Sequence, residues 1–111
     1  MSNINFDELY QQLQTNVISI AKASFQSYFD QAKSDGELAL ENMKENLQTW
    51  TAEVQNGSLT TDDLAFLLKG EEGLNEMLAL KQAGLAEVQI DRFKQAIINL
   101  VVGTVTSLIK V

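Results

Sequence analysis

Apolar side chains recur at helical spacing through the first half of the chain. They stand three or four residues apart, the interval that keeps side chains on one face of an α-helix. The positions are Phe6, Tyr10, Leu13, Val17, Ile20 or Ala21, Phe25, Tyr28 or Phe29, Ala32, Leu40, Met43, Leu47, Trp50 and Val54. From Leu40 onward the gaps alternate between three and four, which is the heptad pattern of a packed helical seam. The pattern predicts helix over residues 5–33 and 35–55.

Two interpretations of the junction between these segments stay open. Ser34 and Glu37 have the spacing of a capping box, which would begin a second helix at Asp35. Against this, the apolar phase is not reset across Gly36, and one glycine inside a helix costs only about 1 kcal/mol. The first half is therefore either one long helix, continuous or kinked near Gly36, or two helices.

The second half of the chain carries clearer helix boundaries. Gly57 suits the left-handed position that follows a helix end, and Thr60 with Asp63 suits the first turn of the next helix. Further helices are predicted over residues 61–69, 72–83 and 86–109. The last of these is apolar nearly all round from Ala96 onward, so we expect it to contact more than one neighbour.

These elements predict a single all-α domain over residues 1–111, a small helical bundle. It consists of the long N-terminal helix, two short helices and a long apolar C-terminal helix. An unbroken helix over residues 5–55 would be about 75 Å long, far beyond the diameter of a small domain. Such a helix needs a partner to bury its stripe, and the simplest partner is a second copy of the chain.

The sequence therefore predicts self-association, or association with another helical protein, through the apolar stripe. The candidate interface residues are Phe25, Phe29, Leu40, Met43, Leu47, Trp50 and Val54. Trp50 has two interpretations, because a tryptophan there either anchors an interface or packs on the helix at residues 61–69. The expected function is that of a small structural or interaction protein.

The composition argues against catalysis and against cofactors. Cysteine, histidine and proline are absent, which removes thiolate nucleophiles, the usual zinc sites and the commonest general base. The segment around Gly57 fails as a calcium loop, because Ala52 and Val54 would occupy ligand positions without a side-chain oxygen. We expect the acidic row of Glu37, Glu41 and Glu45 to face solvent. No catalytic, cofactor-binding or metal-binding residues are predicted.

The net charge of −7 narrows the classes of partner that we expect. An acidic surface is repelled by phosphate backbones, so nucleic-acid binding is not expected. The last helix is locally cationic through Arg92, Lys94 and Lys110, which leaves a peripheral membrane or membrane-complex role as the alternative function. The uncharged stretch 95–109 is shorter than the roughly 20 residues that a spanning helix needs. Residues 1–8 lack a basic start and an apolar run, so we expect a cytoplasmic location.

Overall fold

The computed structural model describes residues 5–109, with the side chain of Ile109 left out. This part of the chain forms α-helices and contains no strand, so the predicted all-α bundle is confirmed. The helices are α1 (Phe6–Ser24), α2 (Phe29–Asn42), α3 (Lys44–Gln55), α4 (Thr61–Lys69), α5 (Glu72–Glu76), α6 (Leu78–Gln82) and α7 (Glu87–Ile109).

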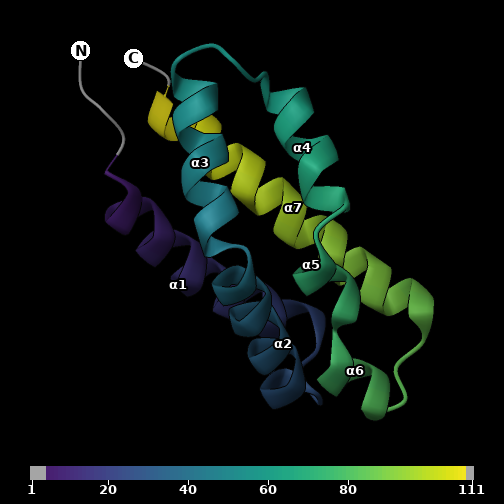
Figure 1. Ribbon diagram of the computed structural model, residues 1–111. Helices are drawn as coiled ribbons and strands as arrows, with labels where there is room; N and C mark the ends of the chain where they lie inside the picture. The colour runs from purple at the N-terminus through teal and green to yellow at the C-terminus, as the bar shows by residue number, and fades with distance from the viewer. Residues whose placement is uncertain (1–4, 110–111) are drawn as a thin grey trace.

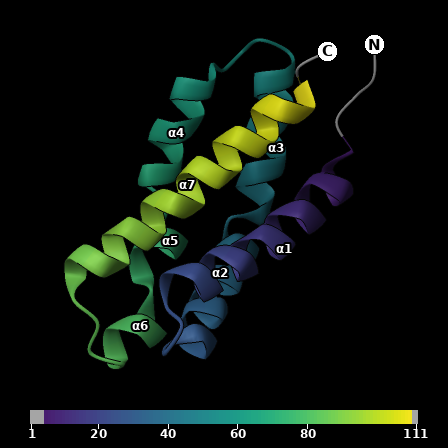
Figure 2. The ribbon, with the colours of Figure 1, turned by 180° about the vertical axis from the view of Figure 1, so that it is seen from behind.

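The helices form two layers over one core. Helices α1 and α7 lie side by side, and the segment from α2 to α6 covers one face of them (Figures 1 and 2). The body measures 46 × 23 × 19 Å. Helix α7 packs against both α1 and α4, as the sequence predicts for a helix that is apolar on most of its surface. No helix within residues 5–109 combines the length and the apolar content that a membrane crossing requires.

The long N-terminal helix is interrupted at a place that the sequence does not mark. Helix α1 ends at Ser24, and the chain turns through residues 25–28 before α2 begins, so the expected helix over 5–33 is wrong in its extent. The turn brings α2 back against α1. Phe25 is buried at the turn, where its ring meets Phe93 of α7 edge to face with a centroid separation of 5.4 Å. Burial of this ring, rather than a glycine or proline, accompanies the change of direction.

Helix α2 continues through Gly36, so the interpretation that begins a second helix at Asp35 is wrong, and the interpretation of one long helix fails elsewhere, at residues 25–28. Gly36 is buried in the middle of α2, where a Cβ atom would lie 2.5 Å from Cγ1 of Val17 on α1. The missing side chain lets the two helices approach. The interruption lies seven residues further on instead, at Met43, whose backbone (φ −104°, ψ 9°) separates α2 from α3. Met43 is itself buried, with 1% exposure.

Most of the helix boundaries predicted for the second half of the chain are correct. Helix α4 has the predicted bounds, and its capping box is present: Thr60 accepts from the Asp63 N–H while Asp63 accepts from the Thr60 N–H. Gly57 is left-handed with a φ of 88°. The predicted helix over 72–83, however, is two short helices, because Met77 adopts a left-handed conformation (φ 39°, ψ 50°) between them.

Asp35 explains how α6 begins after that irregular residue. Met77 provides no side-chain cap, and the first-turn N–H groups of α6 are left without a local acceptor. The buried Asp35 carboxylate of α2 fills this role, accepting from the N–H groups of Ala79 at 3.0 Å and Leu80 at 2.8 Å. Ser34 and Glu37 therefore do not begin a helix; the residue between them caps a different one.

Candidate functional site

The apolar stripe predicted as an interface lies mainly inside the protein. Phe25, Leu40, Met43 and Leu47 are among the buried residues of the core, each with 6% exposure or less. Phe29, Trp50 and Val54 are half-buried against that core. The prediction of these seven residues as an intermolecular seam is therefore wrong for the four buried ones. The turn at residues 25–28 folds the long helix back, so that its stripe is covered by α7 and by the remaining helices.

Trp50 reaches the surface at an apolar groove between α3 and α4. The groove has a volume of about 530 Å³ and is lined by Trp50, Phe66, Leu67, Lys69, Gly70 and Glu71. The ring of Phe66 is 77% exposed, more than any other large apolar side chain in the described part of the chain. Two aromatic side chains, Trp50 and Phe66, thus line the same concave surface. We call this feature the α3–α4 groove.

One end of the α3–α4 groove is tied by a polar contact. Asn46, one turn before Trp50 on α3, donates from Nδ2 to Oε1 of Glu71 at 3.0 Å. Glu71 precedes α5, so this bond joins α3 to the segment that follows α4. The contact joins α3 to the chain after α4 at the end of the groove that Glu71 lines.

Carboxylates dominate the surroundings of the α3–α4 groove. Helical spacing places Asp62 and Asp63 one turn before Phe66 on the same side of α4, and Glu53 one turn after Trp50 on α3. Together with Glu71 they make four acidic side chains against the single ammonium of Lys69. The lining itself carries one acid, Glu71, and one base, Lys69, and helical spacing adds three carboxylates about one turn away. We call these four acidic side chains the rim of the groove.

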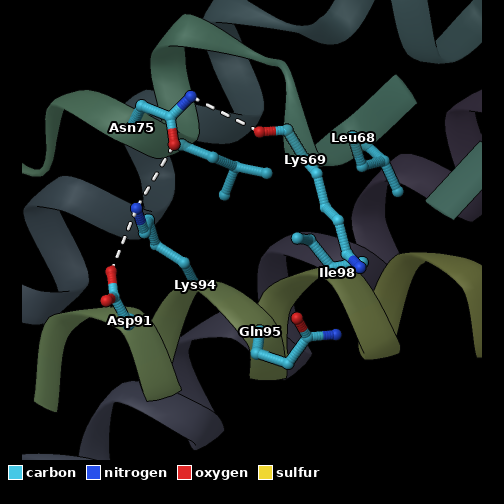
Figure 3. Close-up of a pocket in the computed structure, with 8 residues that line it drawn as sticks. Leu68, Lys69, Asn75, Asp91, Lys94, Gln95 and Ile98 are labelled. Atoms are coloured by element: carbon cyan, nitrogen blue, oxygen red, sulfur yellow. Dashed lines mark hydrogen bonds and ion pairs between the residues drawn. The ribbon is translucent and has the colours of Figure 1, made fainter. Parts of the chain in front are cut away.

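A second cavity, of about 200 Å³, lies between α4, α5 and α7 (Figure 3). Its apolar part consists of Leu68, Leu74 and Ile98. Three of its polar side chains bind one another: Lys94 Nζ lies 3.2 Å from Asp91 Oδ1 and donates to Oδ1 of Asn75 at 3.2 Å. Gln95, which also lines the cavity, donates instead to Asn99 at 3.0 Å. The ammonium and the carboxylate neutralise each other in this arrangement.

Asn75 is the centre of this polar network. Besides accepting from Lys94, its side chain donates to the carbonyl of Lys69 at 3.4 Å, and its own carbonyl accepts from Lys81 Nζ at 2.9 Å. The residue thereby links the end of α4, the α5–α6 segment and α7. These contacts indicate a structural role, because none of them joins a nucleophile to a general base.

The other residues that the sequence singled out occupy ordinary structural positions. Glu37, Glu41 and Glu45 are exposed, and residues 5–109 contain no cluster of carboxylates able to hold a metal ion. The segment around Gly57, which the sequence excludes as a calcium loop, is a capped turn in which the Asn56 side chain accepts from the Ser58 N–H at 2.9 Å.

Tyr10 has a pKa that departs clearly from its ordinary value. Burial of its hydroxyl raises the pKa above the ordinary value of 10.0, and the charge of Glu41 raises it further. Lys44 lies over the ring, with Nζ 4.7 Å from the centroid. The ring belongs to the core, and no nucleophile or acceptor arrangement around it points to catalysis.

The cationic end of the chain is only partly available for a membrane surface. Arg92 is exposed, but the charge of Lys94 is compensated by Asp91 in the same helix. Lys110 lies outside the described residues. What remains on α7 within the described range is a single uncompensated arginine, which is little for electrostatic attraction to anionic lipids.

Phe66 is the main residue that the sequence reasoning missed. The signal lies in the helical phase of α4: Leu64 and Leu68 are four residues apart and fully buried, and Phe66 stands midway between them. Two residues along a helix correspond to a rotation of about 200°, so Phe66 projects away from the core. An aromatic residue on the polar side of a short amphipathic helix was the available clue.

Comparison with known proteins returns no relative. No family model, no curated protein and no solved structure matches the chain. The function is therefore argued from the site alone.

Proposed function

We propose that this chain is a small, non-catalytic interaction protein that receives an apolar helix of another protein in the α3–α4 groove. The observation that carries the proposal is that exposed Phe66 and half-buried Trp50 line the same concave apolar surface. Aromatic side chains at such positions are frequent anchors of protein interfaces. A groove between two helices suits the apolar face of a third, which contributes side chains every three to four residues.

The composition and the second cavity support a non-catalytic role. The chain has neither cysteine nor histidine, and Asn75, Asp91 and Lys94 of the cavity in Figure 3 are engaged with one another. We place this role in the cytoplasm, because a chain without cysteine needs no disulfide bond and is stable under reducing conditions.

Self-association, the partner expected from the sequence, competes for the same groove. The apolar stripe that predicts self-association lies mainly in the core, so it gives a second copy no contact surface at the groove. The proposal accordingly commits to another helical protein.

The proposal is tested with a synthetic helix that has leucines at heptad spacing, glutamines elsewhere and no tryptophan. Trp50 is the sole tryptophan of the chain and lines the groove, so its fluorescence reports binding directly. We expect a saturable change in emission, and we expect Phe66→Ser to weaken binding at least about tenfold, equivalent to about 1.4 kcal/mol.

The matched control is Val88→Ser on α7, which removes another exposed apolar side chain away from the groove. This variant should bind like the wild type. Emission that does not saturate, or an equal loss of binding in both variants, would show that the groove is not the binding site.

A further inference from the structure

The rim of the α3–α4 groove adds information about its occupant. Asp62 and Asp63 are exposed on the α4 side, Glu53 is half-buried on the α3 side, and Glu71 lines one end. Lys69 is the one basic side chain that lines the groove. Asp62, Asp63 and Glu53 stand about one helical turn, roughly 5 Å of helix, from Phe66 or Trp50. This spacing is inside the Debye length of about 8 Å at physiological salt, so a helix docked on the two aromatic residues would feel their charge.

The rim disfavours a second copy of the chain as the occupant. A twofold arrangement places the same surface of both subunits in contact, so four carboxylates would face four others. Two Lys69 side chains cannot offset eight carboxylates, and like charges brought together at an interface cost free energy. Anionic lipid headgroups and phosphate backbones are repelled for the same reason.

We propose that the occupant is a cationic amphipathic helix, whose apolar face packs on Phe66 and Trp50 while its Lys or Arg side chains meet Glu53, Asp62, Asp63 and Glu71. The proposal rests on the proposed function, that the α3–α4 groove receives a helix. It adds the charge of that helix, which determines partner selectivity and association rate more than it determines raw affinity.

The experiment compares three helices of about 18 residues, roughly 27 Å long, that share one leucine face. Their remaining positions are Lys, Gln or Glu, and Trp50 fluorescence is the readout. We expect the Lys helix to bind at least about tenfold more tightly than the Glu helix, and this advantage to shrink as salt rises from about 50 to about 500 mM.

Two sets of variants separate the rim from the overall acidity of the protein. Combined replacement of the rim acids, Glu53→Gln with Asp62→Asn, should lower the preference for the Lys helix by about threefold, because exposed pairs contribute modestly. Neither residue provides a hydrogen bond that the fold depends on in the described contacts of α3 and α4. The control Glu37→Gln removes an exposed carboxylate of α2, away from the groove, and should leave the preference unchanged.

The outcomes distinguish the two proposals. Equal binding of the Lys and Glu helices contradicts the cationic partner and leaves the groove as a binding site. Binding of the Lys helix that is insensitive to Phe66→Ser contradicts both, since it reports charge attraction without the groove. Absence of binding by all three helices contradicts the proposed function itself.

Light scattering provides the remaining comparison. We expect the chain alone to have the molar mass of a monomer over a range of concentrations. A dimer that Phe66→Ser dissociates would show that a second copy occupies the groove, and would overturn the cationic partner.

Discussion

Asp35 is a carboxylate with 5% exposure in the body of α2, and both of its oxygens accept hydrogen bonds from α6. A buried charge is costly unless hydrogen bonds compensate it. Here the two N–H groups also need an acceptor, because Met77 caps nothing. The contact therefore satisfies both groups and joins segments 44 and 45 residues apart in the chain.

Replacement of Asp35 by alanine should remove both bonds and destabilise the protein by about 3 kcal/mol, because the α6 N–H groups lose their acceptor. Asp35→Asn keeps one side-chain acceptor oxygen and should lose about half of that. Urea denaturation followed by circular dichroism measures the free energy of unfolding. Glu37→Ala, an exposed position in the same helix, is the control and should stay within about 0.5 kcal/mol of wild type. Equal stability of Asp35→Ala and the control would mean that the cap contributes nothing.

Tyr10 makes the free energy of unfolding depend on pH in the alkaline range. Its pKa in the folded protein is raised above 10.0 by burial and by Glu41, so the folded state holds the phenolic proton more tightly than the unfolded state. The stabilisation is complete below pH 10 and is lost as the pH rises through the folded-state value. Melting temperatures measured from pH 8 to pH 11 should therefore fall more steeply for the wild type than for Tyr10→Phe. Parallel curves would show that Tyr10 titrates alike in the folded and unfolded states.

At the scale of elements, close approach of α1 and α2 depends on a position without a side chain. Gly36 leaves space for Val17, since a Cβ atom there would lie 2.5 Å from Cγ1 of the valine. Helix propensity alone favours alanine over glycine by about 1 kcal/mol. Overpacking of a tight core typically costs about 1–3 kcal/mol and outweighs that gain.

Gly36→Ala should therefore destabilise the protein by about 1–2 kcal/mol, and Val17→Ala in the same chain should recover part of the loss. Gly103 of α7 is the matched control, because nothing lies within 4 Å of a Cβ atom built there. Gly103→Ala should stabilise by up to about 1 kcal/mol. Thermal melts compare the three variants, and a stabilised Gly36→Ala would disprove the close packing of α1 on α2.

At the scale of the whole molecule, the fold decides which apolar residues remain available to a partner. The turn at residues 25–28 folds α2 back against α1, and a local irregularity at Met43 separates α2 from α3. The extended stripe thereby lies in the interior of a two-layer bundle (Figures 1 and 2). Leu40 and Leu47 are fully buried as a result, whereas Phe66 stays in solvent beside Trp50. The surface proposed for interaction therefore shares only Trp50 with the stripe that suggested interaction in the first place.

The sequence by itself determined the helical class, the bounds of α4 and the capped turn before it, and the packing of α7 against more than one neighbour. These features depend on local signals: apolar spacing, Thr60 with Asp63, and the positive φ of Gly57. It also located the buried stripe correctly as a set of apolar positions. Each of these can be inferred because the interacting groups are within about one or two helical turns of each other.

Only the tertiary structure decided where the chain reverses, why α5 and α6 are separate, and which apolar side chains stay exposed. The reversal at residues 25–28 is accompanied by the contact of Phe25 with Phe93, and the start of α6 depends on Asp35. Both involve residues more than 40 positions apart, and no spacing rule connects them. Gly36, for which local reasoning left open a continuous helix, a kink or a break, is a packing position, because its missing side chain leaves space for Val17. The phase of α4 directed Phe66 outward, but only the neighbouring α3 made its surroundings a groove.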